Sequence, residues 1–412
     1  NINNKYTTNN TIDPNGNLNL RSDKSNDMDH YLLKKGTLSA ENKNSEIEAV
    51  LGIMKVALET EKKQKQVEEA AALPPFKDSP FRLTINRMDD EILAAINALE
   101  GNETKRITVS KSCPPEDFKR IGKFLWITRL AISQNKTIDS FEPVVQLTGL
   151  KEFQATGLSA SKERPIDLEP LAGLTQLESV DFNGTRVKNT QALAGLTKLV
   201  KIKLNMSAVD SIDFLTSTPN VEELNLYGFK HTFENYKPLL ALTSLKSLNI
   251  YMNKQATDEK LLPLQKLTSL ETISMSNSRE VTTLQFLKNC SNIKSIKASW
   301  CRKLTDISDL ADKNELQDVG ISDCAVEDLS PLKGKQKLRT LDCSKTSFSD
   351  LTLLAASTEL RSLKINGTPI TDISPLTTFT DLSSLTVSES IPEEQINALQ
   401  EALPKLRIRK SK

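Results

Sequence analysis

The chain has 412 residues, enough for two or three ordinary domains or for one elongated repeat array. Its formal net charge is only +1, so no bulk electrostatic attraction favours nucleic acid or an anionic membrane. No apolar run approaches the roughly 18 residues that a transmembrane helix requires, so membrane insertion is not expected. Aromatic residues make up 5% of the chain, which suits a thin core of Leu and Ile.

The first two segments differ from the rest of the chain. Residues 1–44 begin with eight Asn among the first 20 positions and predict a disordered polar tail. Residues 45–125 predict a helical N-terminal region that either caps the following repeats or binds a partner. Within it, apolar residues at helical spacing are Ile47, Val50, Leu51, Met54 and Leu58. A second helix is expected from Asp89 or Asp90 to Leu99, and a short strand over 106–109.

Residues 126–390 repeat one phrase with a period of about 22 residues. One clean copy contains Leu360, Leu363, Ile365, Thr368, Ile370, Asp372, Ile373, Pro375 and Leu376. A period of this length indicates an α/β leucine-rich repeat solenoid with a parallel concave sheet and a convex side of short 3-10 turns. The expected central strand residues are Leu130, Phe153, Val180, Ile202, Leu224, Leu248, Ile273, Ile296, Val319, Leu341, Leu363 and Leu385, which makes about twelve coils.

Two repeated features explain how a coil turns. Each strand has two apolar residues, and three positions after the second of them stands a short side chain that can bond the backbone of the turn. It is Asn135, Thr185, Ser207, Asn253, Ser278, Cys301, Cys324, Thr346, Thr368 and Ser390, whereas Leu158 and Phe229 break the series. Outer segments such as 328–332 and 372–376 combine Asp, Ser and Pro, which predicts a capped 3-10 turn.

The last segment, residues 391–412, predicts a C-terminal cap. A helix is expected over 393–399, followed by apolar Leu403, Leu406 and Ile408. Without a cap, the last coil would expose its core and its strand edge to water.

The phrase from Ile370 to Leu382 resembles the internalin-type leucine-rich repeats of bacterial surface and effector proteins. The resemblance covers residues 125–410, and residues 45–125 do not match an internalin cap. It implies a leucine-rich repeat fold and protein recognition through the concave face, often of a host protein. The polar N-terminal tail fits a secreted effector better than a protein anchored to the cell surface.

Little in the sequence points to catalysis. The two histidines, His30 and His231, are too few for a triad or a His-rich metal site. Cys113 has no identifiable base beside it, so we expect no enzyme, no cofactor and no metal. Cys301 and Cys324 occupy equivalent places in adjacent coils. They are expected to be buried thiols, with a disulfide as the alternative.

The outward strand positions are therefore the candidates for binding. Most are small and polar, but Tyr227 and Tyr251 occur at equivalent places in neighbouring coils. The predicted partner-binding residues are Lys203, Asn225, Tyr227, Asn249, Tyr251 and Trp300, with Phe229, His231 and Tyr236 expected beside them in longer coils. Alternatively, the two tyrosines only stack on each other and cover the sheet.

We therefore expect a non-enzymatic module that recognises a protein. A bacterial effector or virulence-associated protein that binds a host protein is the favoured form, secreted or in the host-cell cytoplasm. The alternative is a cytoplasmic scaffold protein that assembles through its N-terminal helical region. An enzyme with its catalytic unit in residues 46–125 is a third possibility.

Overall fold

The computed structural model describes residues 11–12, 18–19, 32–33, 82–88, 90, 93, 106–158, 165–204, 209, 211–227 and 236–411. The chain divides into two compact units, Asn1–Pro75 with Asp89–Asn102, and Phe76–Met88 with Glu103–Lys412. Most of the predicted tail and the whole of the predicted helix from Ser45 lie outside the described residues.

In the first unit the described residues form short elements. Strands β1 (Thr11–Ile12), β2 (Leu18–Asn19) and β3 (Leu32–Leu33) pair antiparallel in that order. Of the helix expected up to Leu99, Asp90 and Leu93 are described and both are helical. The remainder of that helix falls outside the described residues.

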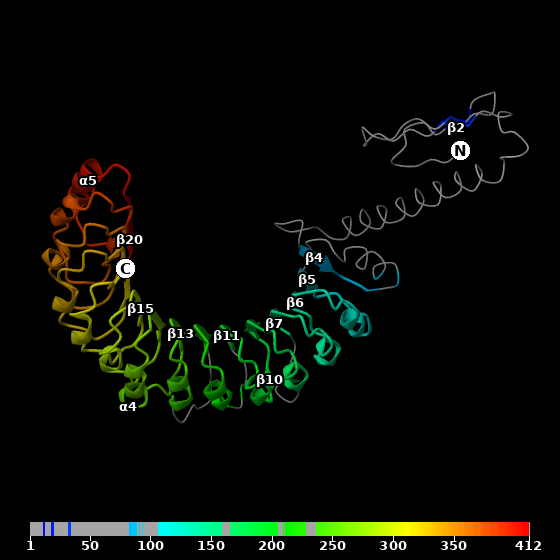
Figure 1. The fold of residues 1–412 in the computed structure, drawn as a ribbon. Coiled ribbons are helices and arrows are strands. Elements are labelled where there is room, and N and C mark those ends of the chain that lie inside the picture. Colours follow the sequence, from blue (N-terminus) through cyan, green and yellow to red (C-terminus); the bar gives the residue numbers. More distant parts are fainter. Residues whose placement is uncertain are drawn as a thin grey trace, which may run out of the picture. The chain divides into compact units, whose positions relative to one another are not determined.

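The second unit is built on one sheet of 15 strands, all paired in parallel, which lines the concave side of the repeat array (Figure 1). Its strands are β4 (Arg82–Ile85), β5 (Arg106–Val109), β6 (Arg129–Ser133), β7 (Glu152–Thr156), β9 (Ser179–Asp181), β11 (Lys201–Lys203), β12 (Glu223–Asn225), β13 (Ser247–Asn249), β14 (Thr272–Ser274), β15 (Ser295–Lys297), β16 (Asp318–Gly320), β17 (Thr340–Asp342), β18 (Ser362–Lys364), β19 (Ser384–Ser388) and β20 (Arg407–Ser411). The twelve predicted central residues are direct register partners from β6 to β19. The predicted leucine-rich repeat solenoid is therefore confirmed.

The sheet extends beyond the twelve predicted coils at both ends. The strand expected at 106–109 is β5, and Leu83 of β4 and Ile107 of β5 continue the register of Leu130. At the other end, Ile408 of β20 pairs with Leu385. Since the chain before β4 and β5 lacks the Leu-x-x-Leu phrase, sequence periodicity did not reveal these two coils.

The convex side carries short helices, as expected (Figure 1). The 3-10 helices are η1 (Lys119–Lys123), η2 (Glu142–Val144), η3 (Glu169–Leu171), η4 (Thr190–Leu193), η5 (Asp213–Ser217), η6 (Lys237–Ala241), η7 (Leu262–Lys266), η8 (Gln285–Leu287), η9 (Ser308–Leu310), η10 (Ser330–Leu332), η11 (Leu351–Leu354) and η12 (Ser374–Thr378). The α-helices are α3 (Pro115–Phe118), α4 (Asp258–Leu261) and α5 (Glu393–Ala402), and strands β8 (Ile166–Asp167) and β10 (Val187–Lys188) form a separate parallel pair. No helix in the described part of the chain has the length and apolar character needed to cross a membrane.

Aspartates cap the 3-10 turns, which confirms the sequence prediction. The Oδ1 atoms of Asp328 and Asp372 each accept from the backbone N–H two residues later at 2.8 Å. These backbone hydrogen bonds, together with a serine hydroxyl in the same turn, hold the pKa of each carboxyl below its ordinary value. The repeated Asp is thus part of the scaffold.

The predicted cap helix is α5, and it satisfies the backbone of the coil below it. Gln395 Oε1 accepts from the backbone N–H of Ile373 at 2.9 Å, and Gln395 Nε2 donates to the carbonyl of Thr371 at 3.1 Å. Leu399 is buried on the last coil. The helix therefore closes the core and supplies hydrogen bonds that a further coil would otherwise make.

Most of the polar turn residues bond the backbone as their position requires, although the buried Oγ of Ser278 has no hydrogen-bond partner among the described residues. Asn135 is fully buried, and its Nδ2 donates to the carbonyls of Ser110 (3.0 Å) and Cys113 (2.8 Å) of the preceding coil. Its Oδ1 accepts from the N–H groups of Thr137 and Ile138 in its own turn. One side chain therefore satisfies four backbone groups in two coils.

The series of turn residues has exceptions. Ser390 is exposed, so its predicted place in the series is wrong, because the turn at this position leads into the cap helix and not into another coil. Leu158 is buried, and its N–H donates to the Thr185 hydroxyl at 3.0 Å. Ser207 and Phe229 lie outside the described residues.

Four consecutive coils carry a buried side chain with a hydrogen-bond donor at a position where most other coils have Leu or Phe. Lys313 and Lys335 are each 1% exposed, and their ammonium groups donate to the carbonyls of Lys288 (2.8 Å) and Ala311 (2.6 Å) in the preceding coils. Cys290 and Ser357 in the flanking coils make the same kind of bond, to the carbonyls of Leu267 and Lys335. Backbone carbonyls thus accept hydrogen bonds from all four buried side chains.

The turn network predicts a large effect for Asn135→Ala. The change leaves two carbonyls and two N–H groups without their partner, one of each kind buried and the other partly buried, and we expect the free energy of unfolding to fall by about 3 kcal/mol. Urea unfolding followed by circular dichroism measures this. Ser390→Ala is the control and should change stability by less than about 0.5 kcal/mol. Equal effects of the two changes would contradict the role given to Asn135.

The buried Lys335 predicts that the free energy of unfolding depends on pH. Burial lowers the pKa of its ammonium below the ordinary 10.5. The unfolded chain therefore binds this proton more tightly than the folded chain, and stability rises with pH between the lowered pKa and 10.5. As the pH increases towards that value, the wild type should gain stability relative to Lys335→Met. The two proteins share every other titrating group, so a constant difference in unfolding free energy would refute the prediction.

Candidate functional site

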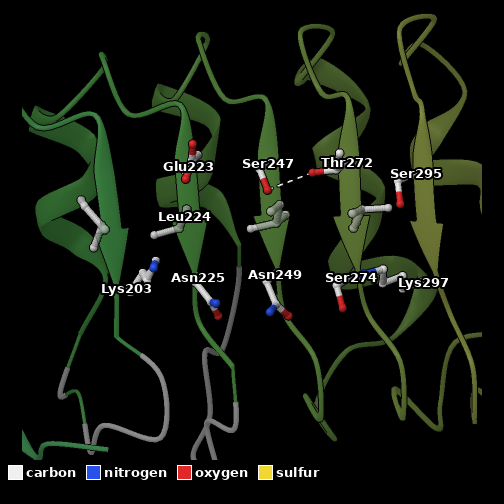
Figure 2. A pocket seen from close by; sticks show the side chains of 13 residues that line it. Lys203, Glu223, Leu224, Asn225, Ser247, Asn249, Thr272, Ser274, Ser295 and Lys297 are labelled. Atoms are coloured by element: carbon white, nitrogen blue, oxygen red, sulfur yellow. Dashed lines mark hydrogen bonds between the residues drawn. The ribbon is translucent and has the colours of Figure 1, made fainter. Parts of the chain in front are cut away.

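A shallow groove of about 330 Å³ runs across β11 to β15 on the concave side (Figure 2). Its lining residues are Ile202, Lys203, Glu223, Leu224, Asn225, Ser247, Leu248, Asn249, Thr272, Ile273, Ser274, Ser295 and Lys297. Alternation along each strand turns the polar members of this set outward and the apolar ones toward the core. The small side chains of three neighbouring strands leave room above the sheet, which is why a groove forms here.

Charged side chains flank the polar middle of the groove (Figure 2). Lys203 lies at one side and forms an ion pair with Asp181 at 3.5 Å, while Glu223 accepts from Lys201 at 2.6 Å. Lys297 at the other side is exposed, and no acidic partner for it occurs among the described residues. Between them, the hydroxyl of Thr272 donates to Ser247 Oγ at 2.9 Å. The middle of the groove is thus uncharged and rich in hydroxyl and amide groups.

The structure brings four predicted site residues together at one edge of this groove. The side-chain oxygens of Asn225 and Asn249 accept from the backbone N–H groups of Tyr227 (3.1 Å) and Tyr251 (2.9 Å), respectively. The tyrosine rings lie side by side with centroids 4.9 Å apart at an interplanar angle of 41°. Both rings remain half-buried. The asparagines therefore hold the strand ends that carry the aromatic pair, and both also line the groove.

Tyr236 does not belong to this surface, so its predicted place beside the site is wrong. It is 1% exposed, and its hydroxyl oxygen accepts from Asn253 Nδ2 at 2.5 Å. Burial raises the pKa of its phenol. Tyr236 begins the outer turn η6 and acts as a core residue. Phe229 and His231, which the sequence also suggested, fall outside the described residues.

A row of left-handed residues follows the strands, and the sequence analysis missed it. In nine coils the residue after the last outward strand position has a φ between 51° and 72°. These are Gln134, Gly157, Gly184, Met252, Asn277, Trp300, Asp323, Lys345 and Gly367. In Met252, Asn277 and Trp300 the N–H donates to the next coil at 2.8 to 2.9 Å. Glycine adopts left-handed backbone most readily, so the three glycines of the row are the residues by which the sequence could have indicated it.

Trp300 is the bulkiest residue of that row and stands apart from the tyrosine pair. Its φ is 65° and its side chain is 44% exposed. The guanidinium of Arg302 lies 5.7 Å from the ring centroid, and the ammonium of Lys345 lies 6.0 Å from it. Left-handed backbone costs a bulky residue about 1 kcal/mol or more, so the fold itself does not favour Trp here. An exposed, strained aromatic residue between two cations is a candidate contact residue.

The cysteines show no sign of nucleophilic chemistry. All five are buried free thiols, so the disulfide between Cys301 and Cys324 is not formed. Their Sγ atoms instead lie near the carbonyls of Met275 and Ala298. For Cys113, burial and the nearby Asp117 raise the pKa to about 12. In the described part of the chain, no group of three His, Cys, Asp or Glu is placed to hold a metal ion.

The fold is that of a leucine-rich repeat protein, and solved structures of this class resemble it. An internalin (InlF) from Listeria monocytogenes has 24% sequence identity, covers 71% of this chain and 82% of its own, and gives a TM-score of 0.59. A leucine-rich repeat protein of Leptospira interrogans has 14% identity, covers 84% of this chain and 98% of its own, and gives 0.63. A plant peptide hormone receptor, RGFR1, was solved in complex with RGF2. It has 14% sequence identity, covers 77% of this chain and 56% of its own, and gives a TM-score of 0.50.

No protein-family model matches the sequence, and no curated protein matches it either. The likeness to internalins that the repeat phrase suggested is therefore confirmed at the level of the fold.

The strain at Trp300 predicts that Trp300→Gly costs little stability. Glycine relieves the left-handed backbone by about 1 kcal/mol, which offsets the lost cation contacts of about the same size. We expect the free energy of unfolding to change by less than about 1 kcal/mol. Thermal or urea unfolding tests this against Trp300→Val, which keeps the strain and should be less stable. A loss of more than about 2 kcal/mol in the glycine variant would show that Trp300 is a scaffold residue.

Proposed function

We propose that this chain is a non-enzymatic recognition module that binds a protein partner on the concave face. The observation that carries the proposal is the pair Tyr227 and Tyr251, half-buried beside the groove with ring centroids 4.9 Å apart. The proposed contact surface comprises Lys203, Asn225, Tyr227, Asn249, Tyr251 and Trp300. It combines hydrogen-bonding groups in the groove with large aromatic surfaces at its edge, which is the composition of protein-binding hot spots.

The scaffold does not require tyrosine at these two places. The equivalent residue in the next four coils is serine, at Ser276, Ser299, Ser322 and Ser344. Those coils keep the same strand pairing as the coils of Tyr227 and Tyr251. Tyrosine therefore adds exposed apolar area where the fold accepts a small polar side chain, and that addition favours a binding role over a structural one.

A protein ligand is also consistent with the comparisons. The plant receptor that shares the fold is a peptide hormone receptor, and it was solved in complex with RGF2. We propose that the partner of this chain is likewise a protein, bound by a rigid surface whose strands are fixed by their neighbours. A preformed surface of this kind loses little conformational entropy on binding.

The internalin-like fold supports a bacterial protein that recognises a host protein. We propose a secreted or host-cell-cytoplasmic effector with a role in virulence as the form that this recognition takes. The alternative, a cytoplasmic scaffold assembled through the N-terminal helical region, depends on a helix that lies outside the described residues. The site on β11 to β15 gives the concave-face proposal a geometric basis that the alternative lacks.

Replacement of both tyrosines tests the proposal. The variant Tyr227→Ser plus Tyr251→Ser introduces the residue that four other coils use, so the fold should be retained. Loss of two aromatic anchors should weaken partner binding at least about a hundredfold. Binding is measured by calorimetry with a partner identified by affinity capture from host lysate. The unfolding transition of the variant should stay within a few degrees of the wild type.

The control is Tyr227→Phe plus Tyr251→Phe, which keeps the stacked rings and should retain most of the affinity. If the serine variant binds as tightly as the wild type, the tyrosines serve only to cover the sheet. If the serine variant loses its fold together with its binding, the tyrosines are needed for the fold, and a binding role is likewise contradicted.

A further inference from the structure

Three cations occupy equivalent positions in three successive coils, beside the left-handed row. Lys254, Arg279 and Arg302 each lie two residues after a left-handed residue, and all three are exposed. The left-handed residues are tied coil to coil by backbone hydrogen bonds, so the cations repeat at the coil spacing of about 4.8 Å. The row therefore extends over about 10 Å. We call these three residues the cationic rim.

The cationic rim is not neutralised by the chain itself. Among the described residues, ion pairs between neighbouring coils are frequent, and Lys303, directly after Arg302, bonds Glu280 at 2.6 Å. No acidic partner is found in this part of the chain for any residue of the rim. No ion pair within the described residues therefore offsets the three charges of this short strip.

Two contacts restrain the guanidinium groups of the rim in positions where a ligand can reach them. Arg279 Nε donates to the side-chain oxygen of Asn277 at 2.9 Å, which restrains the guanidinium along the row. Arg302 lies over the indole ring of the exposed Trp300, with 5.7 Å between its Cζ atom and the ring centroid. A carboxylate that reaches Arg302 would thus form a charge-assisted hydrogen bond while its methylene groups contact the indole.

We propose that the cationic rim, together with Trp300, binds an acidic, extended segment of the protein partner. This inference rests on the proposed function, because the rim is continuous with the tyrosine edge of the groove through Tyr251, three residues before Lys254. Two or three carboxylates on one extended segment match a row of three cations over about 10 Å. A nucleic acid fits less well, since three cations over about 10 Å neutralise only a few phosphates of a longer backbone.

The experiment uses the fluorescence of Trp300. The chain has two tryptophans, and the indole N–H of Trp126 is buried without a hydrogen-bond partner, so Trp126→Phe removes the second signal without breaking a hydrogen bond. In this background, a short peptide of alternating Glu and Gly should change the emission of Trp300 in a saturable manner. The affinity should fall as salt is added, because the contacts are exposed ion pairs.

Charge-neutralising variants locate the binding. Arg279→Gln plus Arg302→Gln should weaken binding of the acidic peptide by about tenfold or more. The matched control, Lys266→Gln plus Lys288→Gln, removes the same charge from exposed lysines on the outer segments of the neighbouring coils. It should change the affinity by less than about twofold, since those lysines lie away from the rim.

Several outcomes would overturn the inference. These are no emission change with the acidic peptide, equal weakening by the control variant, or equally tight binding of a Lys–Gly peptide. Tighter binding of single-stranded oligothymidylate would assign the rim to nucleic acid instead. If the rim variant leaves partner binding intact while the tyrosine variant abolishes it, only the acidic-segment inference fails. If both variants bind the partner normally, the proposed function fails as well.

Discussion

The constraint on which the whole array depends is that each coil must give its backbone hydrogen bonds to its neighbours. A strand of three residues cannot satisfy itself, so every N–H and C=O at the concave side points to the coil before or after. The ladder does not end with the strand: the left-handed residue that follows donates one further bond to the next coil, as Trp300 does to Ser322 at 2.8 Å. The short turn residue then closes the coil. Buried Asn135 shows how one side chain replaces the missing backbone partners of two coils.

This constraint separates scaffold residues from those that are free to serve binding. Residues that complete the ladder, such as Asn253 in the turn and the capping Asp328, are explained by the bonds they make. Serine at the edge of the sheet is compatible with the ladder because it is small and polar. The side chains of Tyr227, Tyr251 and Trp300 add no hydrogen bond to the ladder, although the backbone N–H of Trp300 does. Their aromatic surface therefore requires another explanation, and contact with a partner supplies one.

The core tolerates polar residues when a backbone carbonyl is within reach. The Leu-x-x-Leu phrase predicts an apolar residue at Lys313 and Lys335, and a surface position would be the ordinary expectation for lysine. Both are buried instead, because each long side chain ends at a carbonyl of the preceding coil, and Lys313 also forms an ion pair with Asp312 at 2.8 Å. The repeat thus sets where a side chain points, and hydrogen bonding decides whether a polar one can stay there.

The sequence by itself determined the repeat, the parallel sheet, the capped 3-10 turns and the closing helix, because each depends on residue types at a regular spacing. It also singled out Tyr227, Tyr251 and Trp300, because they interrupt that regularity. The tertiary structure alone decided three other features: that Tyr236 is in the core, that strands β4 and β5 extend the sheet, and that Arg302 and Lys345 flank Trp300. These features depend on side-chain packing within and between coils and on which residues adopt left-handed backbone, and the repeat period of the sequence encodes neither.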